Sequence, residues 1–149
     1  MINAFAAMQA KGSLEAFHYD PGPLGHTDVE IQVEYCGVCH SDLSMIDNDW
    51  GRSAYPLVPG HEVIGTVAAT GAGVTTLAVG DVVGLGWHSQ YCMACSLCAS
   101  RDHNLCLSAQ PTIVGRHGGF ADKVRASATS VVKLPPGIAP LPFAHLLQI

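Results

Sequence analysis

Four cysteines within fifteen residues are the densest set of chemically reactive side chains in this sequence. They are Cys92, Cys95, Cys98 and Cys106, with the spacing C-x2-C-x2-C-x7-C. Thiolates this close together suit one tetrahedral zinc ion, which four sulfurs bind at about 2.3 Å and surround completely. A site closed in this way has no open position for a substrate. The spacing therefore predicts a structural zinc site that holds the loop over residues 89–108.

Two other uses of clustered cysteines compete with zinc. An iron–sulfur cluster also accepts C-x2-C-x2-C, but the ferredoxin run closes with C-x3-C-P, whereas Cys106 comes later and precedes Leu107. Disulfides suit neither the short spacing nor a reducing compartment. Zinc is therefore the favoured metal for this loop, and an iron–sulfur cluster is its main rival.

Two short motifs upstream contain a second pair of metal-binding residue types. Cys39 directly precedes a predicted helix, where the helix dipole favours a thiolate. His61 follows Gly60, which permits a sharp turn, and precedes the carboxylate of Glu62. A catalytic zinc has three protein ligands and keeps its fourth position open. Cys39 and His61 would supply two of these ligands, and Glu62 or water would complete the shell.

Each of these residues also has a simpler interpretation. A single histidine at the start of a strand is commonly a hydrogen-bonded structural residue, so the ligand role of His61 depends on its combination with Cys39 and Glu62. Cys36 and Cys39 form a C-x-x-C pair that a thioredoxin-like redox site would use, but such a site needs a long helix in an α/β unit. The histidines without such neighbours are predicted to be surface or core residues: His18, His26, His88, His103, His117 and His145.

The composition is that of a globular chain. Of the 149 residues, 48% are hydrophobic and only 13% are charged, which excludes a disordered chain. The formal net charge of −5 and the scattered lysines and arginines argue against nucleic acid as a partner. No apolar run is long enough to span a membrane, and Met1 to Lys11 do not form a secretory signal. We therefore expect a cytoplasmic protein whose cysteines bind metal rather than form disulfides.

Hydrophobic periodicity predicts short strands joined by glycine-containing turns. Asp28 to Tyr35 alternates between apolar and polar residues, as a half-buried strand does. A short helix is expected from His40 to Ile46, with Ser41 or Asp42 as its N-cap. Further strands are predicted over residues 63–70, 82–83, 120–125 and 131–134, and an irregular loop over residues 48–59. This pattern predicts a mainly β fold, in the form of a compact barrel.

These motifs together resemble the zinc-containing medium-chain alcohol dehydrogenases, and the similarity runs from about Asn3 to Gly137. It is carried by Gly60-His61-Glu62-x-x-Gly65 continuing from Gly71 to Val74, by Cys36-Gly-Val-Cys-His-Ser-Asp42, and by the four-cysteine loop. Tyr35 to Trp50 and Tyr55 to Pro59 are similar to the bacterial NADPH-dependent zinc aldehyde reductases close to the cinnamyl alcohol dehydrogenases. The resemblance implies a GroES-like β-barrel with one structural and one catalytic zinc ion.

The resemblance also implies a role for each site residue. Cys39 and His61 would bind the catalytic zinc, and Glu62 would approach it. Ser41 matches the family's proton-relay hydroxyl, Asp42 the carboxylate that orients the zinc-bound histidine, and His40 a residue beside the cofactor pyrophosphate. The implied activity interconverts primary alcohols and aldehydes with NADP(H) or NAD(H), with zinc as a Lewis acid.

The sequence departs from the family pattern in two places. Ser44 stands where many relatives have a histidine that ends the proton relay. Residues 138–149 lack the cysteine that is the third zinc ligand in the family, and no G-x-G-x-x-G follows a strand, so no nucleotide-binding domain is expected in this chain. Trp50 and Trp87 fit a substrate pocket and a plain core equally well.

We therefore expect residues 1–137 to form the GroES-like catalytic domain and residues 138–149 to begin the connection to a missing cofactor domain. Pro140 to Ile149 would start a helix. The main hypothesis is a fragment of a zinc-dependent alcohol dehydrogenase or aldehyde reductase, inactive alone, whose full-length form is a homodimer acting on a small alcohol or aldehyde. The alternatives are a non-catalytic zinc-binding barrel and an iron–sulfur or dithiol redox module.

Overall fold

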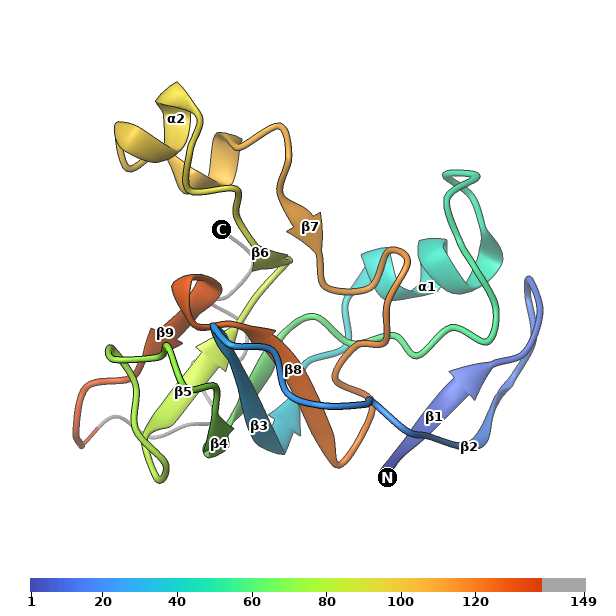
Figure 1. Cartoon of the computed structure of the whole chain (residues 1–149). Coiled ribbons are helices and arrows are strands. Elements are labelled where there is room, and N and C mark those ends of the chain that lie inside the picture. Colours follow the sequence, from blue (N-terminus) through green and yellow to red (C-terminus); the bar gives the residue numbers. More distant parts are fainter. Residues whose placement is uncertain (138–149) are drawn as a thin grey trace.

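A five-stranded antiparallel sheet is the centre of the computed structural model, which describes residues 1–137 (Figure 1). Its strands, in spatial order, are β8 (Lys123–Ser127), β3 (Asp28–Cys36), β4 (Val63–Thr70), β5 (Val82–Leu85) and β9 (Val131–Lys133). The sheet curls into a half-barrel, so the mainly β, barrel-type fold is confirmed. No helix within residues 1–137 is both long and apolar enough to cross a membrane.

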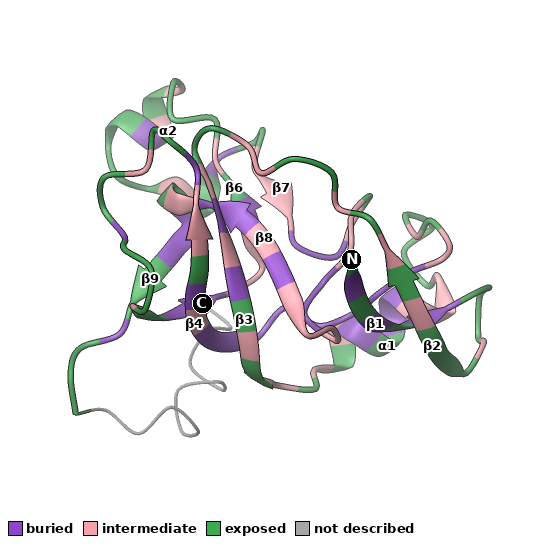
Figure 2. Cartoon of the chain, turned by 60° about the horizontal axis from the view of Figure 1, so that its bottom comes forward, coloured by how far each residue is buried: buried purple, intermediate pink, exposed green. Residues whose placement is uncertain are grey.

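The core of the sheet follows from alternation along β3 and from the β-branched sequence of β4. Val29 and Ile31 of β3 are fully buried, while the residues between and after them are partly or fully exposed (Figure 2). Ile31 pairs with Val67 of β4, which is also buried, and both belong to one apolar cluster with Val83 and Val124. β-Branched side chains pack well on such a pleated, half-buried surface.

A hairpin of β1 (Ile2–Ala7) and β2 (Leu14–Tyr19) precedes the sheet and was not predicted. The buried positions of β1 are Ile2, Ala4, Ala6 and Ala7. Because alanine does not favour strands, the sequence contains no signal for β1. Two isolated bridges, Ala4 with Ala121 and Ala7 with Leu57, join this hairpin to the rest of the domain.

The predicted helix is present as α1 (His40–Asp47), but its N-cap was predicted wrongly. The N-cap is Cys39, and Asp42 lies at the third helical position. The Asp42 carboxylate reaches back and accepts a hydrogen bond from the Cys39 N–H, at 3.0 Å. The helix therefore begins two residues earlier than a Ser41 cap would allow.

The four-cysteine loop forms a lobe that extends beyond β6 (His88–Gln90) and β7 (Gln110–Pro111), two short paired strands (Figure 1). Within it are one short helical turn, α2 (Ser96–Ala99), and one 3-10 turn, η1 (His103–Leu105). A further 3-10 turn, η2 (Ala128–Ser130), connects β8 to β9. The lobe has little regular structure of its own.

The predicted strand over residues 120–125 is shifted, since β8 covers Lys123–Ser127. Phe120 does not join the sheet because its backbone N–H donates to the Pro59 carbonyl, at 2.9 Å. The strands predicted over residues 63–70, 82–83 and 131–134 are present as β4, β5 and β9, within two residues of the expected ends. The helix expected at Pro140 to Ile149 lies outside the described residues.

We predict that Ile31→Ala lowers the free energy of unfolding by about 2–5 kcal/mol, because it leaves a cavity in the sheet core. The matched control is Val132→Ala in β9, where the side chain is 58% exposed and the loss should stay near 0.5 kcal/mol. Urea unfolding followed by circular dichroism measures both. Equal losses for the two variants would contradict this description of the core.

Candidate metal centres

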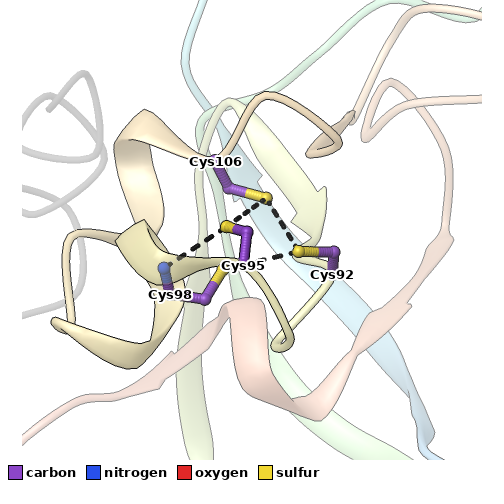
Figure 3. A group of neighbouring side chains, drawn as sticks. All are labelled: Cys92, Cys95, Cys98 and Cys106. Carbon is purple, nitrogen blue, oxygen red and sulfur yellow. Dashed lines mark hydrogen bonds between the residues drawn. The ribbon is translucent and has the colours of Figure 1, made fainter.

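The four lobe sulfurs point toward one another (Figure 3). Sγ–Sγ distances are 3.4 Å between Cys92 and Cys106, 3.8 Å between Cys92 and Cys98, and 4.0 Å between Cys95 and Cys106. All four sulfurs lie within 4.8 Å of one another, and all four cysteines are free thiols rather than disulfides. The local chain, from β6 through α2 and η1 to β7, is sufficient to bring them together.

These distances fit one ion at the centre of the four sulfurs. Sulfurs about 2.3 Å from a shared tetrahedral centre lie about 3.8 Å from one another, whereas a disulfide would join two of them at about 2.0 Å. The backbone N–H groups of Ala94 and Cys95 lower the pKa of the Cys92 thiol to about 6, whereas burial raises the pKa of the Cys98 thiol to about 12, so Cys92 becomes the thiolate that a metal requires before Cys98 does. The donor set therefore suits a closed tetrahedral metal site.

A second group of candidate ligands comes from two distant segments. Cys39 caps the N-terminus of α1, and His61 and Glu62 form the turn that leads into β4. One ligand atom from each residue lies within 4.8 Å of the others. His61 and Glu62 are buried, while Cys39 is half-buried. The structure thus brings together the three residues that the sequence placed in this site.

Asp42 connects the two segments of this second centre. Its Oδ1 lies 2.9 Å from Nδ1 of His61 and accepts from the Gly60 N–H at 2.8 Å, while its Oδ2 accepts from the Cys39 N–H. With the proton of His61 on Nδ1, the lone pair of Nε2 is available to a metal ion. Asp42 is only 2% exposed, so water does not compete for these hydrogen bonds. The carboxylate therefore determines the orientation of the imidazole ring.

The turn that carries His61 is held by a segment that the sequence did not point to. Gly118 donates to the Val58 carbonyl at 2.8 Å, and Gly119 donates to the Gly60 carbonyl at 2.7 Å. Gly60 has φ of +98°, a conformation that glycine adopts readily. A side chain at Gly118 would collide with the carbonyls of Pro59 and Gly60. The Gly118-Gly119 pair, which directly precedes the strand predicted over residues 120–125, therefore supports the metal-site turn.

Glu62 lies inside the protein, next to Gly37. Glu62 is fully buried, and its backbone carbonyl accepts a hydrogen bond from the Gly37 N–H at 2.9 Å. A Cβ atom at Gly37 would overlap Oε2 of Glu62. The glycine between Cys36 and Cys39 thus leaves the space that the Glu62 carboxylate occupies beside Cys39.

Two tryptophans form one side of the second centre. The ring of Trp87 contacts that of His61 edge to face, with centroids 5.0 Å apart, and Trp50 contacts Trp87 in the same manner at 6.1 Å. Trp87 is half-buried and packs against the cluster of Met45, Leu57 and Ile113, whereas Trp50 is 46% exposed. Trp87 is therefore both a core residue and a neighbour of the candidate ligand His61. Trp50 lies on the solvent-exposed side of Trp87.

The remaining predicted site residues lie on α1. His40 is exposed and Ser41 is half-buried, whereas Ser44 is buried. Within residues 1–137, none of the other histidines belongs to a cluster of candidate metal ligands. His18 and His26 are exposed, while His88, His103 and His117 are half-buried and contact other aromatic rings or the protein interior. His145 lies outside the described residues.

Cys36 is a thiol of a different kind from Cys39. It lies under the metal-site turn, where a Cβ atom at Gly60 would approach its sulfur to 2.8 Å. Burial raises the pKa of the Cys36 thiol to about 12, so the group stays neutral near pH 7. Cys36 and Cys39 are both free in the structure. A neutral, enclosed thiol is poorly suited to the dithiol redox chemistry that the C-x-x-C spacing permits.

Comparison with known proteins relates this arrangement to one family. The profile of the alcohol dehydrogenase GroES-like domain matches residues 25–136. The aldehyde reductase AdhA of Synechocystis sp. is 67% identical over 138 residues, which are 93% of this chain and 41% of the relative. The cinnamyl alcohol dehydrogenase structure from Sorghum bicolor superposes with a TM-score of 0.91 at 36% identity, covering 98% of this chain and 44% of that one.

A cinnamyl alcohol dehydrogenase from Helicobacter pylori, solved as a complex with NADP(H), also superposes with a TM-score of 0.91, at 26% identity. The match covers 98% of this chain and 45% of that chain. This chain therefore spans less than half the length of the relatives that it matches.

We predict that iodoacetamide at pH 7.5 leaves Cys36 unmodified in the folded protein, because its pKa of about 12 keeps it protonated. Peptide mass spectrometry measures the modified fraction at each cysteine. The control is the same protein in urea, where Cys36 should react like any exposed thiol. Rapid modification of Cys36 in the folded state, or a Cys36–Cys39 disulfide under mild oxidation, would support a dithiol redox site instead.

Proposed function

This chain belongs to the alcohol dehydrogenase family through its GroES-like domain, and we propose that it is the catalytic part of a zinc-dependent alcohol dehydrogenase or aldehyde reductase. Residues 1–137 form this domain, and residues 89–108 form its structural zinc lobe. The observation that carries the proposal is the Cys39, His61 and Glu62 cluster, whose ligand atoms lie within 4.8 Å of one another beside the carboxylate of Asp42.

The chemistry of the donors supports a zinc ion at this cluster. A thiolate and an imidazole with a free Nε2 are typical zinc ligands, and Glu62 adds a carboxylate. A zinc ion bound with one open position would supply Lewis acidity toward an alcohol or carbonyl oxygen. The protein's own contribution is positional: Asp42 holds the His61 ring, and the Gly118-Gly119 segment holds the turn.

Ser41 is proposed to move the substrate's hydroxyl proton. It lies two residues after the N-cap Cys39 on α1 and is half-buried, so it is partly accessible to solvent. A hydroxyl both donates and accepts a hydrogen bond, as a proton relay requires. His40 is exposed, which suits the proposed contact with the pyrophosphate of a nicotinamide cofactor. Ser44 is buried and is not a candidate for an outer relay position.

The proposed substrate class is aldehydes and primary alcohols, with NADP(H) as the proposed cofactor. Relatives named as an aldehyde reductase and as cinnamyl alcohol dehydrogenases support this substrate class, and the complex of one such relative with NADP(H) supports the cofactor. Trp50 and Trp87, beside His61, would offer aromatic surface to the substrate. We also propose a cytoplasmic location, which the sequence composition led us to expect, and a homodimeric full-length form.

The lobe has a structural part in this proposal. Its sulfurs would enclose a second zinc ion completely, which leaves no position for a substrate. Such an ion replaces the apolar core that this loop lacks, because the lobe contains only short helical turns and two short strands.

We predict about two zinc ions per chain by elemental analysis, one in each centre. Cys39→Ser should lower the content to about one, and Cys106→Ser should disrupt the lobe and remove the other ion. One zinc in the unmodified protein would indicate a non-catalytic zinc-binding barrel, and iron with visible absorption would indicate an iron–sulfur protein.

A conservative substitution tests the role of Asp42. Asp42→Asn keeps the side-chain shape but removes the charge that orients His61, and we expect zinc at the Cys39 centre to bind about 10- to 100-fold more weakly. The matched control is Asp49→Asn, an exposed aspartate just beyond the same helix, which should leave both sites unchanged. Competition with a chelator measures the affinity.

A chimera tests the proposed activity. We predict that residues 1–137, joined to the remainder of the Synechocystis aldehyde reductase in place of its own matching segment, restore NADPH-dependent aldehyde reduction. Ser41→Ala in this chimera should lower turnover by about 10²- to 10⁴-fold, the range for loss of a proton-transfer group. A folded chimera that holds two zinc ions and has no activity would contradict the catalytic proposal while leaving the metal sites intact.

A further inference from the structure

A cavity outside both candidate metal centres has the features of a binding site. It has a volume of about 730 Å³ and opens between the β1–β2 hairpin, the segment with Tyr55 and Pro56, and the residues before β8. None of the candidate zinc ligands lines it. Cavities of this volume accommodate small organic molecules.

Arg116 is the most unusual residue of the cavity wall. Its Nη1 donates to Oγ of the fully buried Ser89 at 2.6 Å, and its Nη2 donates to the backbone carbonyl of Arg125. Its third nitrogen, Nε, is buried and has no hydrogen-bond partner within residues 1–137. The two hydrogen bonds that it makes are to neutral oxygens, which hold the guanidinium in place without neutralising it.

Within residues 1–137, no carboxylate forms a direct ion pair with this charge. In the described part of the chain, Arg116 has no ion pair within 4.0 Å, whereas Arg125 is paired with Glu30 at 2.8 Å. Asp20 also lines the cavity, but its carboxylate accepts a hydrogen bond from the Gly22 N–H instead. Burial lowers the pKa of Arg116, and the Asp28 carboxylate, which is too far away to form an ion pair, opposes this shift only in part. A partly desolvated cation without a directly paired counter-ion is costly, and an anion bound beside it would relieve that cost.

Aromatic rings form the rest of the wall near Arg116. The rings of Tyr19 and His117 are in contact, with centroids 4.4 Å apart, and both residues line the cavity together with Tyr55. Nδ1 of His117 is buried and has no partner within residues 1–137. Flat rings next to the Arg116 guanidinium provide contact area for a planar or apolar group attached to an anion.

We propose that this cavity binds a small organic oxyanion, a carboxylate or a phosphate ester, whose charge is held by Arg116 and whose organic part lies against Tyr19, Tyr55 and His117. The site is separate from the proposed zinc chemistry, and the proposal does not depend on it. Arg125 is not the binding cation, since Glu30 and the carbonyls of Pro21 and Gly22 already take its hydrogen bonds.

Calorimetric titration of the whole chain with benzoate, phenyl phosphate and inorganic phosphate, at constant ionic strength, tests the proposal. We expect saturable binding of at least one of these anions, and no binding of the neutral analogue benzamide. Tighter binding of phenyl phosphate than of benzoate would identify a phosphate ester as the preferred ligand, and the reverse a carboxylate. Absence of saturable binding for all three anions would overturn the proposal.

Substitutions of cavity residues test whether the anion binds at Arg116. Arg116→Gln should weaken anion binding by about tenfold or more, because a charge-assisted hydrogen bond is lost, and Arg116→Lys should weaken it less. The charge control is Lys133→Gln, which removes one exposed cation on β9 that is not part of the cavity lining, and should leave the affinity within about twofold.

Ala54→Trp keeps the test decisive if Arg116→Gln does not fold. Ala54 is an exposed residue on the cavity lining, and an indole there would fill the space without touching the core. Binding should be lost in this variant, while its unfolding midpoint stays near that of the unmodified chain. Unchanged anion affinity in Ala54→Trp, or in a folded Arg116→Gln, would overturn the assignment of the cavity.

Discussion

The buried carboxylate of Asp42 is the interaction on which the second metal centre depends. An ionised group out of contact with water is stable only where donors surround it, and Asp42 has three: the backbone N–H groups of Cys39 and Gly60 and the ring of His61. These donors come from a helix terminus and from a turn nineteen residues away. The hydrogen bonds that stabilise the Asp42 carboxylate therefore bring Cys39 and the His61 turn together. The same carboxylate selects the tautomer of His61 with the proton on Nδ1.

Close backbone packing makes this arrangement possible. Gly37 leaves room for the Glu62 carboxylate, Gly60 takes a left-handed conformation, and Gly118 and Gly119 bring a third segment against the turn. Side chains at these positions would push the segments apart by more than a metal site can accept, because ligand atoms must stay within a few tenths of an ångström of their place. The ligands thus stand on a helix N-terminus and a strand start rather than on a free loop.

How far the sequence could predict the fold depended on how local each signal was. Alternation along Asp28–Cys36 and the β-branched run at Val63–Thr70 predicted β3 and β4 almost to the residue, because side-chain burial alone produces those patterns. The β1–β2 hairpin was missed because its buried positions are mostly alanine. The strand after Phe120 was displaced because that residue pairs with Pro59, and no local pattern encodes a pairing between distant segments.

The difference between local signals and contacts of distant segments also applies to the two candidate metal centres and to the cavity. The four cysteines of the lobe could be assigned to one site from the sequence itself, since their short spacing lets a single loop bring all four sulfurs to one ion without help from distant segments. Cys39, His61 and Glu62 were also assigned to one site, but through their residue types and the family resemblance, because their separation in the chain does not by itself require them to be close. The family resemblance implied that Asp42 orients His61. Only the tertiary structure showed that Asp42 also holds the Cys39 and Gly60 backbone, that Trp87 lies against His61, and that Arg116 has no direct ion pair among residues 1–137. Those features arise from contacts between segments far apart in the chain, and they exist only once the sheet and its supporting turns have formed.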